Sequence, residues 1–156
     1  MLTYLSDSIG KLQALTSLGI YTCENLTLYS LTDNIGNLST LRRFEIYGCK
    51  NITHFPASFC QLQALTTLKI WNFNKLTHLP VTIGNLRTLI TLHIQYCEKL
   101  THTILPNSIC FCKNLRNIYV SNVNMLPPSL ILLTNLTNIY IGYLFTTVVI
   151  LIKESL

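Results

Sequence analysis

Three histidines recur at a constant interval, and imidazole can bind zinc or change its charge near neutral pH. His54, His78 and His102 are each 24 residues apart, so they hold the same place in successive stretches of the chain. A structural zinc site usually needs four ligands, and Asp and Glu together number only 6. We therefore expect an exposed histidine column without metal or cofactor, with metal binding or pH sensing as the alternative.

Cysteine is the second residue type that could do chemistry, and the chain has 6 of them. Cys110 and Cys112 form a C-x-C pair, which is not the C-x-x-C spacing of zinc and redox motifs. Six cysteines in 156 residues are also too few for the disulfide framework of a small secreted domain. We expect six free, structural thiols in a reducing compartment.

Catalytic and nucleic-acid-binding patterns are missing from the sequence. It contains no G-x-S-x-G, no H-E-x-x-H and no glycine fingerprint for a dinucleotide. The net charge is +5, but the 11 basic residues are scattered and form no run of five or more. The sequence therefore predicts neither an enzyme nor a nucleic-acid-binding protein.

The histidine spacing is one sign of an internal repeat that runs through the chain. Residues 52–75 align with residues 76–99 almost position for position. Each unit has an anchor leucine that begins the pattern L-x-x-L-x-L-x-x-C/N. The anchors are Leu15, Leu41, Leu65, Leu89, Leu115 and Leu136, and the last position of the pattern, expected to pack in the turn after the strand, holds Cys23, Cys49, Phe73, Cys97, Val123 and Leu144.

The pattern predicts the structure of one unit. In a strand, Leu92 and Ile94 point one way while His93 points the other way, so each unit gives a short strand with one apolar face. One unit cannot bury that face alone, but stacked units bury a continuous apolar column. Proline and Gly-Asn in the second half of each unit disfavour long helices, so short turns or 3-10 pieces are expected there.

This pattern is that of a leucine-rich repeat, and it resembles the repeat domain of plant nucleotide-binding leucine-rich-repeat disease-resistance receptors. Residues 8–12, 34–38 and 82–86 carry the S/T/N-I-G-x-L element, and Cys23, Cys49 and Cys97 carry the I-x-x-C ending. The resemblance implies an α/β solenoid, a horseshoe segment of about six repeats with a parallel sheet on its concave face. It also implies a cytoplasmic role in plant defence. The nucleotide-binding motif G-x-x-x-x-G-K-[ST] is absent, so nucleotide hydrolysis is not implied.

The concave face is where a protein partner is expected to bind, because solenoids commonly bind through this surface. The outward positions of the strands include aromatic and charged side chains of the types enriched at binding hot spots. Simple stabilisation of the sheet by cross-strand contacts is the alternative role of these residues. The predicted partner-binding residues are Tyr21, Arg43, Glu45, Tyr47, Lys69, Trp71, His93, Gln95, Tyr119 and Tyr140.

The predicted repeat domain covers residues 1–144, and residues 145–156 form an apolar tail that we expect to act as a partial capping unit. The uncharged run 130–152 has the length of a membrane span, for which about 20 residues suffice. However, the sixth repeat uses half of this run, and it contains Asn135 and Asn138. We therefore expect no membrane segment.

A cytoplasmic location is expected, because residues 1–7 have no basic region followed by an apolar one, as a signal peptide would. One candidate partner is another domain of a larger receptor. The alternative is a secreted or membrane-tethered ectodomain that binds an extracellular ligand. In that case the four N-x-[ST] sequons, at Asn25, Asn37, Asn51 and Asn135, would be expected to carry glycans.

Overall fold

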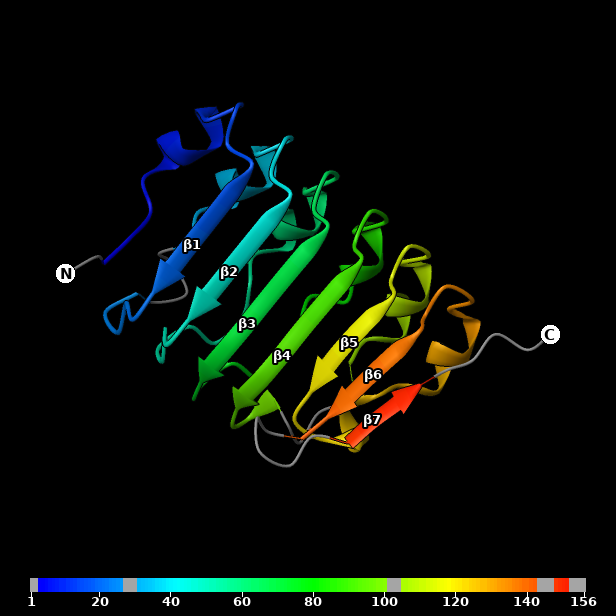
Figure 1. Ribbon diagram of the computed structural model, residues 1–156. Helices are drawn as coiled ribbons and strands as arrows, with labels where there is room; N and C mark the ends of the chain where they lie inside the picture. Colours follow the sequence, from blue (N-terminus) through cyan, green and yellow to red (C-terminus); the bar gives the residue numbers. More distant parts are fainter. Residues whose placement is uncertain (1–2, 27–30, 101–104, 143–147, 152–156) are drawn as a thin grey trace.

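The computed structural model describes residues 3–26, 31–100, 105–142 and 148–151, and each repeat in it contributes one strand to a single open sheet (Figure 1). The strands lie in chain order, each beside the next. Six of them are parallel, as the repeat predicts: β1 (Ser17–Tyr21), β2 (Arg43–Tyr47), β3 (Thr67–Phe73), β4 (Thr91–Cys97), β5 (Asn117–Val120) and β6 (Asn138–Ile141).

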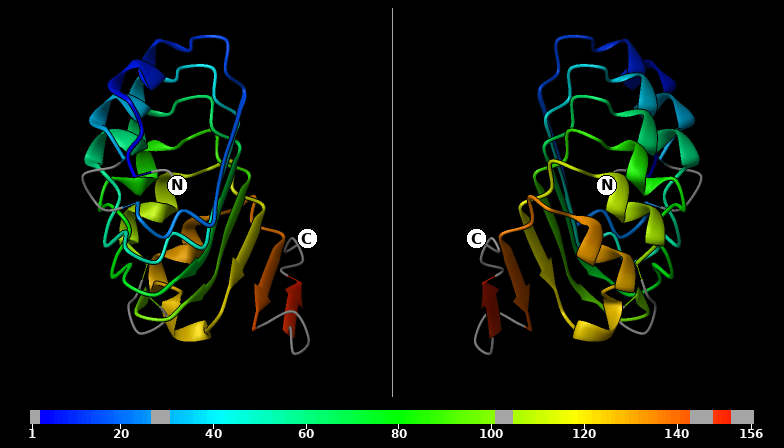
Figure 2. Two further views of the ribbon diagram at one scale, coloured as in Figure 1. Left: turned by 90° about the vertical axis from the view of Figure 1, so that its left-hand side faces the viewer. Right: turned by 90° about the vertical axis from the view of Figure 1, so that its right-hand side faces the viewer.

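Short 3-10 helices form the second layer, behind the sheet (Figure 2). They are short because glycine or proline interrupts the chain and because the 3-10 hydrogen-bond geometry does not favour long runs. Ser6 and Thr32 cap two of them with their side-chain oxygens. The helices are η1 (Asp7–Lys11), η3 (Asp33–Asn37), η4 (Ala57–Gln61), η5 (Ile83–Asn85), η7 (Asn107–Phe111), η8 (Val123–Met125) and η9 (Pro128–Leu132).

The core lies between these two layers and consists of the inward residues of every repeat. The anchor leucines from Leu41 to Leu136 are buried, and Leu15 at the first repeat packs partly buried against them. Phe44 and Phe59 meet edge to face, with ring centroids 5.2 Å apart. The predicted register and the predicted two-layer architecture are both confirmed.

The fifth repeat departs from the predicted pattern. Val123 was expected to pack in the turn after β5, but its side chain is 53% exposed. Asn122 accepts a hydrogen bond from the Asn124 backbone and starts helix η8, which turns Val123 outward and buries Met125 instead. Leu144, the corresponding residue of the sixth repeat, lies outside the described residues.

The last strand, β7 (Val148–Leu151), runs antiparallel to β6 and closes that edge of the sheet. It belongs to the segment that was expected to be an apolar tail, and the rest of that segment, residues 145–147 and 152–156, lies outside the described residues. In the described part of the chain, no helix is long and apolar enough to cross a membrane.

Candidate functional site

The register of the sheet brings the predicted binding residues together in columns on its solvent-facing side, here called the exposed sheet face. Glu45, Lys69, His93, Tyr119 and Tyr140 follow one another across β2 to β6. A parallel column contains Tyr21, Tyr47, Trp71 and Gln95 across β1 to β4. The alignment of these residues is as the repeat predicts, and their role in binding stays a prediction.

Five of the rings form a continuous aromatic array across the exposed sheet face. Tyr47 meets Trp71 edge to face, with centroids 6.0 Å apart and planes at 90°. Trp71 in turn lies 5.3 Å from His93, which stacks on Tyr119 at 4.8 Å. Tyr119 and Tyr140 are parallel, with centroids 4.2 Å apart. The array is therefore a connected surface of rings from β2 to β6.

Tyr96 is a sixth ring at this surface, and the sequence analysis missed it. Strict alternation would place it on the core side, but its φ of 54° turns the backbone, and its ring stacks on Trp71 with centroids 5.6 Å apart. The corresponding positions of the first three repeats, Thr22, Gly48 and Asn72, also have positive φ. Glycine and asparagine at this position were the signal that could have revealed the turn.

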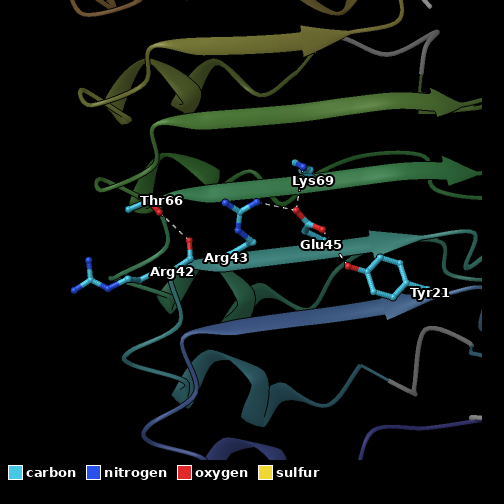
Figure 3. Close-up of polar contacts among 6 residues, drawn as sticks. All are labelled: Tyr21, Arg42, Arg43, Glu45, Thr66 and Lys69. Atoms are coloured by element: carbon cyan, nitrogen blue, oxygen red, sulfur yellow. Dashed lines mark hydrogen bonds and ion pairs between the residues drawn. The ribbon is translucent and has the colours of Figure 1, made fainter. Parts of the chain in front are cut away.

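A charge cluster lies beside the array on β1 to β3 (Figure 3). Glu45 Oε1 is 3.0 Å from both the Arg43 guanidinium and Lys69 Nζ, and the Tyr21 hydroxyl donates to Oε2 at 3.0 Å. Burial alone would raise the pKa of Glu45, but the hydrogen bonds from Lys69, Arg43 and Tyr21 hold this pKa below its ordinary value. The bond to Glu45 raises the pKa of Tyr21. The cluster therefore has two cations and one carboxylate.

Gln95 differs from the other predicted contact residues, because it is only 3% exposed. Its amide nitrogen donates to the Gly142 carbonyl at 2.7 Å, and its amide oxygen lies 2.8 Å from His93 Nε2. A carbonyl can only accept, so this arrangement places a proton on His93 Nε2. Gln95 thus orients His93 and offers little surface of its own, and its predicted role in partner binding stays a prediction.

Burial lowers the pKa of His93, and the nearby Lys69 charge lowers it further. The bond to Gln95 and the charge of Glu45 oppose this effect without reversing it. His93 is therefore neutral at neutral pH, and its ring serves as an aromatic surface.

Two adjoining depressions open on the exposed sheet face beside Trp71. The aromatic groove, of about 320 Å³, is lined by Tyr47, Trp71, Asn72 and Tyr96. The mixed pocket, of about 200 Å³, is lined by Tyr21, Glu45, Ile46, Tyr47, Lys69 and Trp71, so one acidic and one basic side chain lie among apolar surface. Because Tyr47 and Trp71 line both, a single ligand can occupy the two together.

The histidine column lies apart from this face. The rings of His54 and His78 stack with centroids 5.8 Å apart and planes at 11°, next to Thr53 and Thr77. His102 lies outside the described residues. Within the described ranges, no group of three histidine, cysteine or acidic side chains could hold a metal ion.

All six cysteines are free thiols, and most are buried. Burial raises the pKa of Cys97 and Cys112 to about 12 and that of Cys49 to about 11. The Cys97 thiol donates to the Gln95 carbonyl at 3.3 Å, as expected of a structural residue, but Cys97 is the last residue of β4 rather than part of the turn after it. These three thiols stay protonated and are poor nucleophiles.

The stacked strands, the 3-10 layer and the connected surface of rings define a solenoid with one face open for binding. A family model described as "Leucine-rich repeat region" matches residues 2–118. The chain therefore belongs to the leucine-rich-repeat family, whose members are typically protein-binding modules without enzymatic activity. No curated protein matches the chain in sequence.

Solved structures of two other proteins are similar in fold. The plant peptide hormone receptor RGFR1, in complex with RGF2, has a TM-score of 0.58 and 21% identity, with 87% of this chain and 26% of that chain covered. The leucine-rich repeat domain of the type III effector XopL has a TM-score of 0.58 and 21% identity, with 88% of this chain and 51% of that chain covered. The chain thus spans about a quarter and about half of these neighbours.

Proposed function

We propose that the exposed sheet face is the surface through which this chain binds a protein partner. The observation that carries the proposal is the aromatic array next to the charge cluster. Tyr21 and Tyr47 are 55% and 38% exposed. Solvent-exposed rings are enriched among the residues that dominate binding energies, as is arginine. Stabilisation of the sheet alone would not require rings whose surfaces remain open to solvent.

We further propose that the chain acts in the cytoplasm as part of a plant-type intracellular immune receptor, or as a fragment of one. The I-G-x-L and I-x-x-C elements of the repeats support this proposal. The alternative is a secreted or membrane-tethered ectodomain that binds an extracellular ligand, and one neighbour in fold is a plant peptide hormone receptor.

The sequons help to choose between these locations. The amide nitrogens of Asn51 and Asn135 donate to the Glu24 and Lys113 carbonyls of the preceding repeats, at 2.6 and 2.8 Å. A glycan on either nitrogen would crowd these contacts, which favours the cytoplasmic proposal. A glycan detected on the exposed Asn25 of the protein from its native source would instead favour the ectodomain.

The binding proposal is tested by replacing Tyr47 and Trp71 with alanine together. Both rings line the two depressions, so the double variant should lose capture of the partner that the unchanged protein retains from an extract of its source. The matched control is Phe111→Ala, which removes an exposed ring from helix η7, on the other layer.

Circular dichroism and the midpoint of chemical unfolding must show that both variants stay folded. Equal capture by the unchanged protein and the folded double variant would reject the exposed sheet face as the binding surface. Loss of capture by Phe111→Ala would move the surface to the layer of 3-10 helices.

A further inference from the structure

The two depressions differ in the side chains that line them, and together these side chains indicate the chemistry of a ligand. The aromatic groove is lined by three rings and one amide, and no charged side chain lines it. Tyr47 stands perpendicular to Trp71, while Tyr96 is nearly parallel to it. Aromatic rings pair preferentially edge to face or offset-stacked, so this corner suits a further aromatic side chain. The Asn72 amide at the same groove can bond to the backbone of a bound peptide.

The charge cluster, two of whose residues (Glu45 and Lys69) also line the mixed pocket, has an excess of positive charge. Arg43 and Lys69 both contact the same oxygen of Glu45, so two cations share one carboxylate and the cluster has a net charge of +1. The side chains of Arg43 and Lys69 remain 53% and 36% exposed. A guanidinium has five N–H donors and an ammonium three, so both cations have donors to offer a second carboxylate.

We infer that the exposed sheet face binds a peptide segment in which an aromatic residue is flanked by acidic residues, an inference that rests on the proposed function. The aromatic side chain enters the aromatic groove, and a carboxylate pairs with Arg43 and Lys69 of the charge cluster, beside the mixed pocket. The two depressions share Tyr47 and Trp71, so the two side chains come from neighbouring positions of one extended segment.

The charge distribution favours a peptide over single-stranded nucleic acid, which also stacks on aromatic rings. A nucleic acid has one phosphate per nucleotide and needs cations along its whole path. On β4, β5 and β6, the outward residues are neutral: Thr91, His93, Gln95, Asn117, Tyr119, Asn138 and Tyr140. The cations of the face are confined to one end of the aromatic array, where a short acidic segment fits.

Trp71 is the only tryptophan of the chain, so its fluorescence reports directly on both depressions. The full chain is titrated with Gly/Ser peptides that contain Asp-Phe-Asp, Lys-Phe-Lys or Asp-Gly-Asp at the centre, and with an oligothymidylate. We expect Asp-Phe-Asp to bind at least ~10-fold more tightly than each of the other three probes. Its affinity should decrease with added salt, because salt screens exposed charges.

Two variants separate the contributions of the depressions. Arg43→Gln with Lys69→Gln should abolish the preference for Asp-Phe-Asp over Lys-Phe-Lys and keep the preference over Asp-Gly-Asp. Tyr96→Ala should do the reverse, because it opens the aromatic groove and leaves the charge cluster in place. Phe111→Ala is the control and should keep both preferences.

The inference is overturned if Lys-Phe-Lys or the oligothymidylate binds as tightly as Asp-Phe-Asp. It is also overturned if no peptide gives a saturable change in Trp71 fluorescence up to ~1 mM. In either case the capture experiment with Tyr47 and Trp71 replaced still decides the proposed function, because it uses the natural partner. Failure of the ligand chemistry is thus distinguishable from failure of the binding surface.

Discussion

At the scale of single residues, Trp71 connects the aromatic array with both depressions of the exposed sheet face. Its ring contacts Tyr47, His93 and Tyr96, and it lines both the aromatic groove and the mixed pocket. Tryptophan offers a large, rigid contact area, which is why it is so common at binding hot spots. Next to it, the titratable ring of His93 forms part of the aromatic array. Because this ring is buried, the free energy of unfolding should depend on pH.

The free energy of unfolding should fall as the pH falls below 6.5, the ordinary pKa of histidine. Burial lowers the pKa of His93 in the folded state, so the unfolded chain takes up a proton first and is favoured at lower pH. His93→Phe keeps a ring at this position without the titration, and should flatten the dependence below about pH 6.5.

Urea unfolding at a series of pH values measures this effect, whose slope for one proton cannot exceed ~1.4 kcal/mol per pH unit. Glu45, whose folded-state pKa lies below its ordinary value of 4.5, contributes stability that is lost only at lower pH. His78→Phe is the control, because His78 lies away from the exposed sheet face. An unchanged slope in His93→Phe would contradict the assigned burial.

Glycines set the stacking distance at the scale of elements. A Cβ at Gly36 would collide with the backbone carbonyl of Ser58 in the next repeat, and a Cβ at Gly84 would collide with that of Ser108. The I-G pair of the repeat therefore exists because successive 3-10 helices pack backbone against backbone. This close packing in the helical layer constrains the spacing of the strands in the other layer, and with them the residues of the exposed sheet face.

Gly84→Ala should lower the free energy of unfolding by about 1–3 kcal/mol, because the clash is with backbone that cannot move aside. Gly19→Ala is the matched control, since the three atoms nearest to its added Cβ all belong to the side chain of Tyr21, which is exposed and can rotate. Chemical unfolding of both variants provides the comparison. Equal stability of the two would show that the helical layer has room to adjust.

At the scale of the whole molecule, the last strand of the sheet, β7, runs opposite to the other six. β7 pairs with β6 along Asn138–Ile141, and its backbone hydrogen bonds occupy an edge that would otherwise be open. An unpaired strand edge is a template for association with another chain. Among the described residues, β7 thus occupies the edge of β6 at which a further parallel strand would pair.

Deletion of residues 145–156 should make the protein associate with itself as its concentration rises, because the edge of β6 loses its partner. Light scattering coupled to size-exclusion chromatography measures the molar mass. Deletion of residues 153–156 alone retains β7 and should leave the mass at that of the parent chain. A monomeric 145–156 deletion at all concentrations would show that the β6 edge is protected in another way.

The repeat sequence by itself determined the strand order, the register and the columns of the exposed sheet face, because a period of two within each strand and about 24 residues between strands leaves one way to stack the units. Tertiary structure alone decided which of those side chains are accessible. Positive φ at Tyr96 brings its ring onto Trp71, and a bond to Gly142, 47 residues away, holds Gln95 below the surface. Alternation cannot predict either feature, because both depend on backbone turns and on contacts between distant repeats.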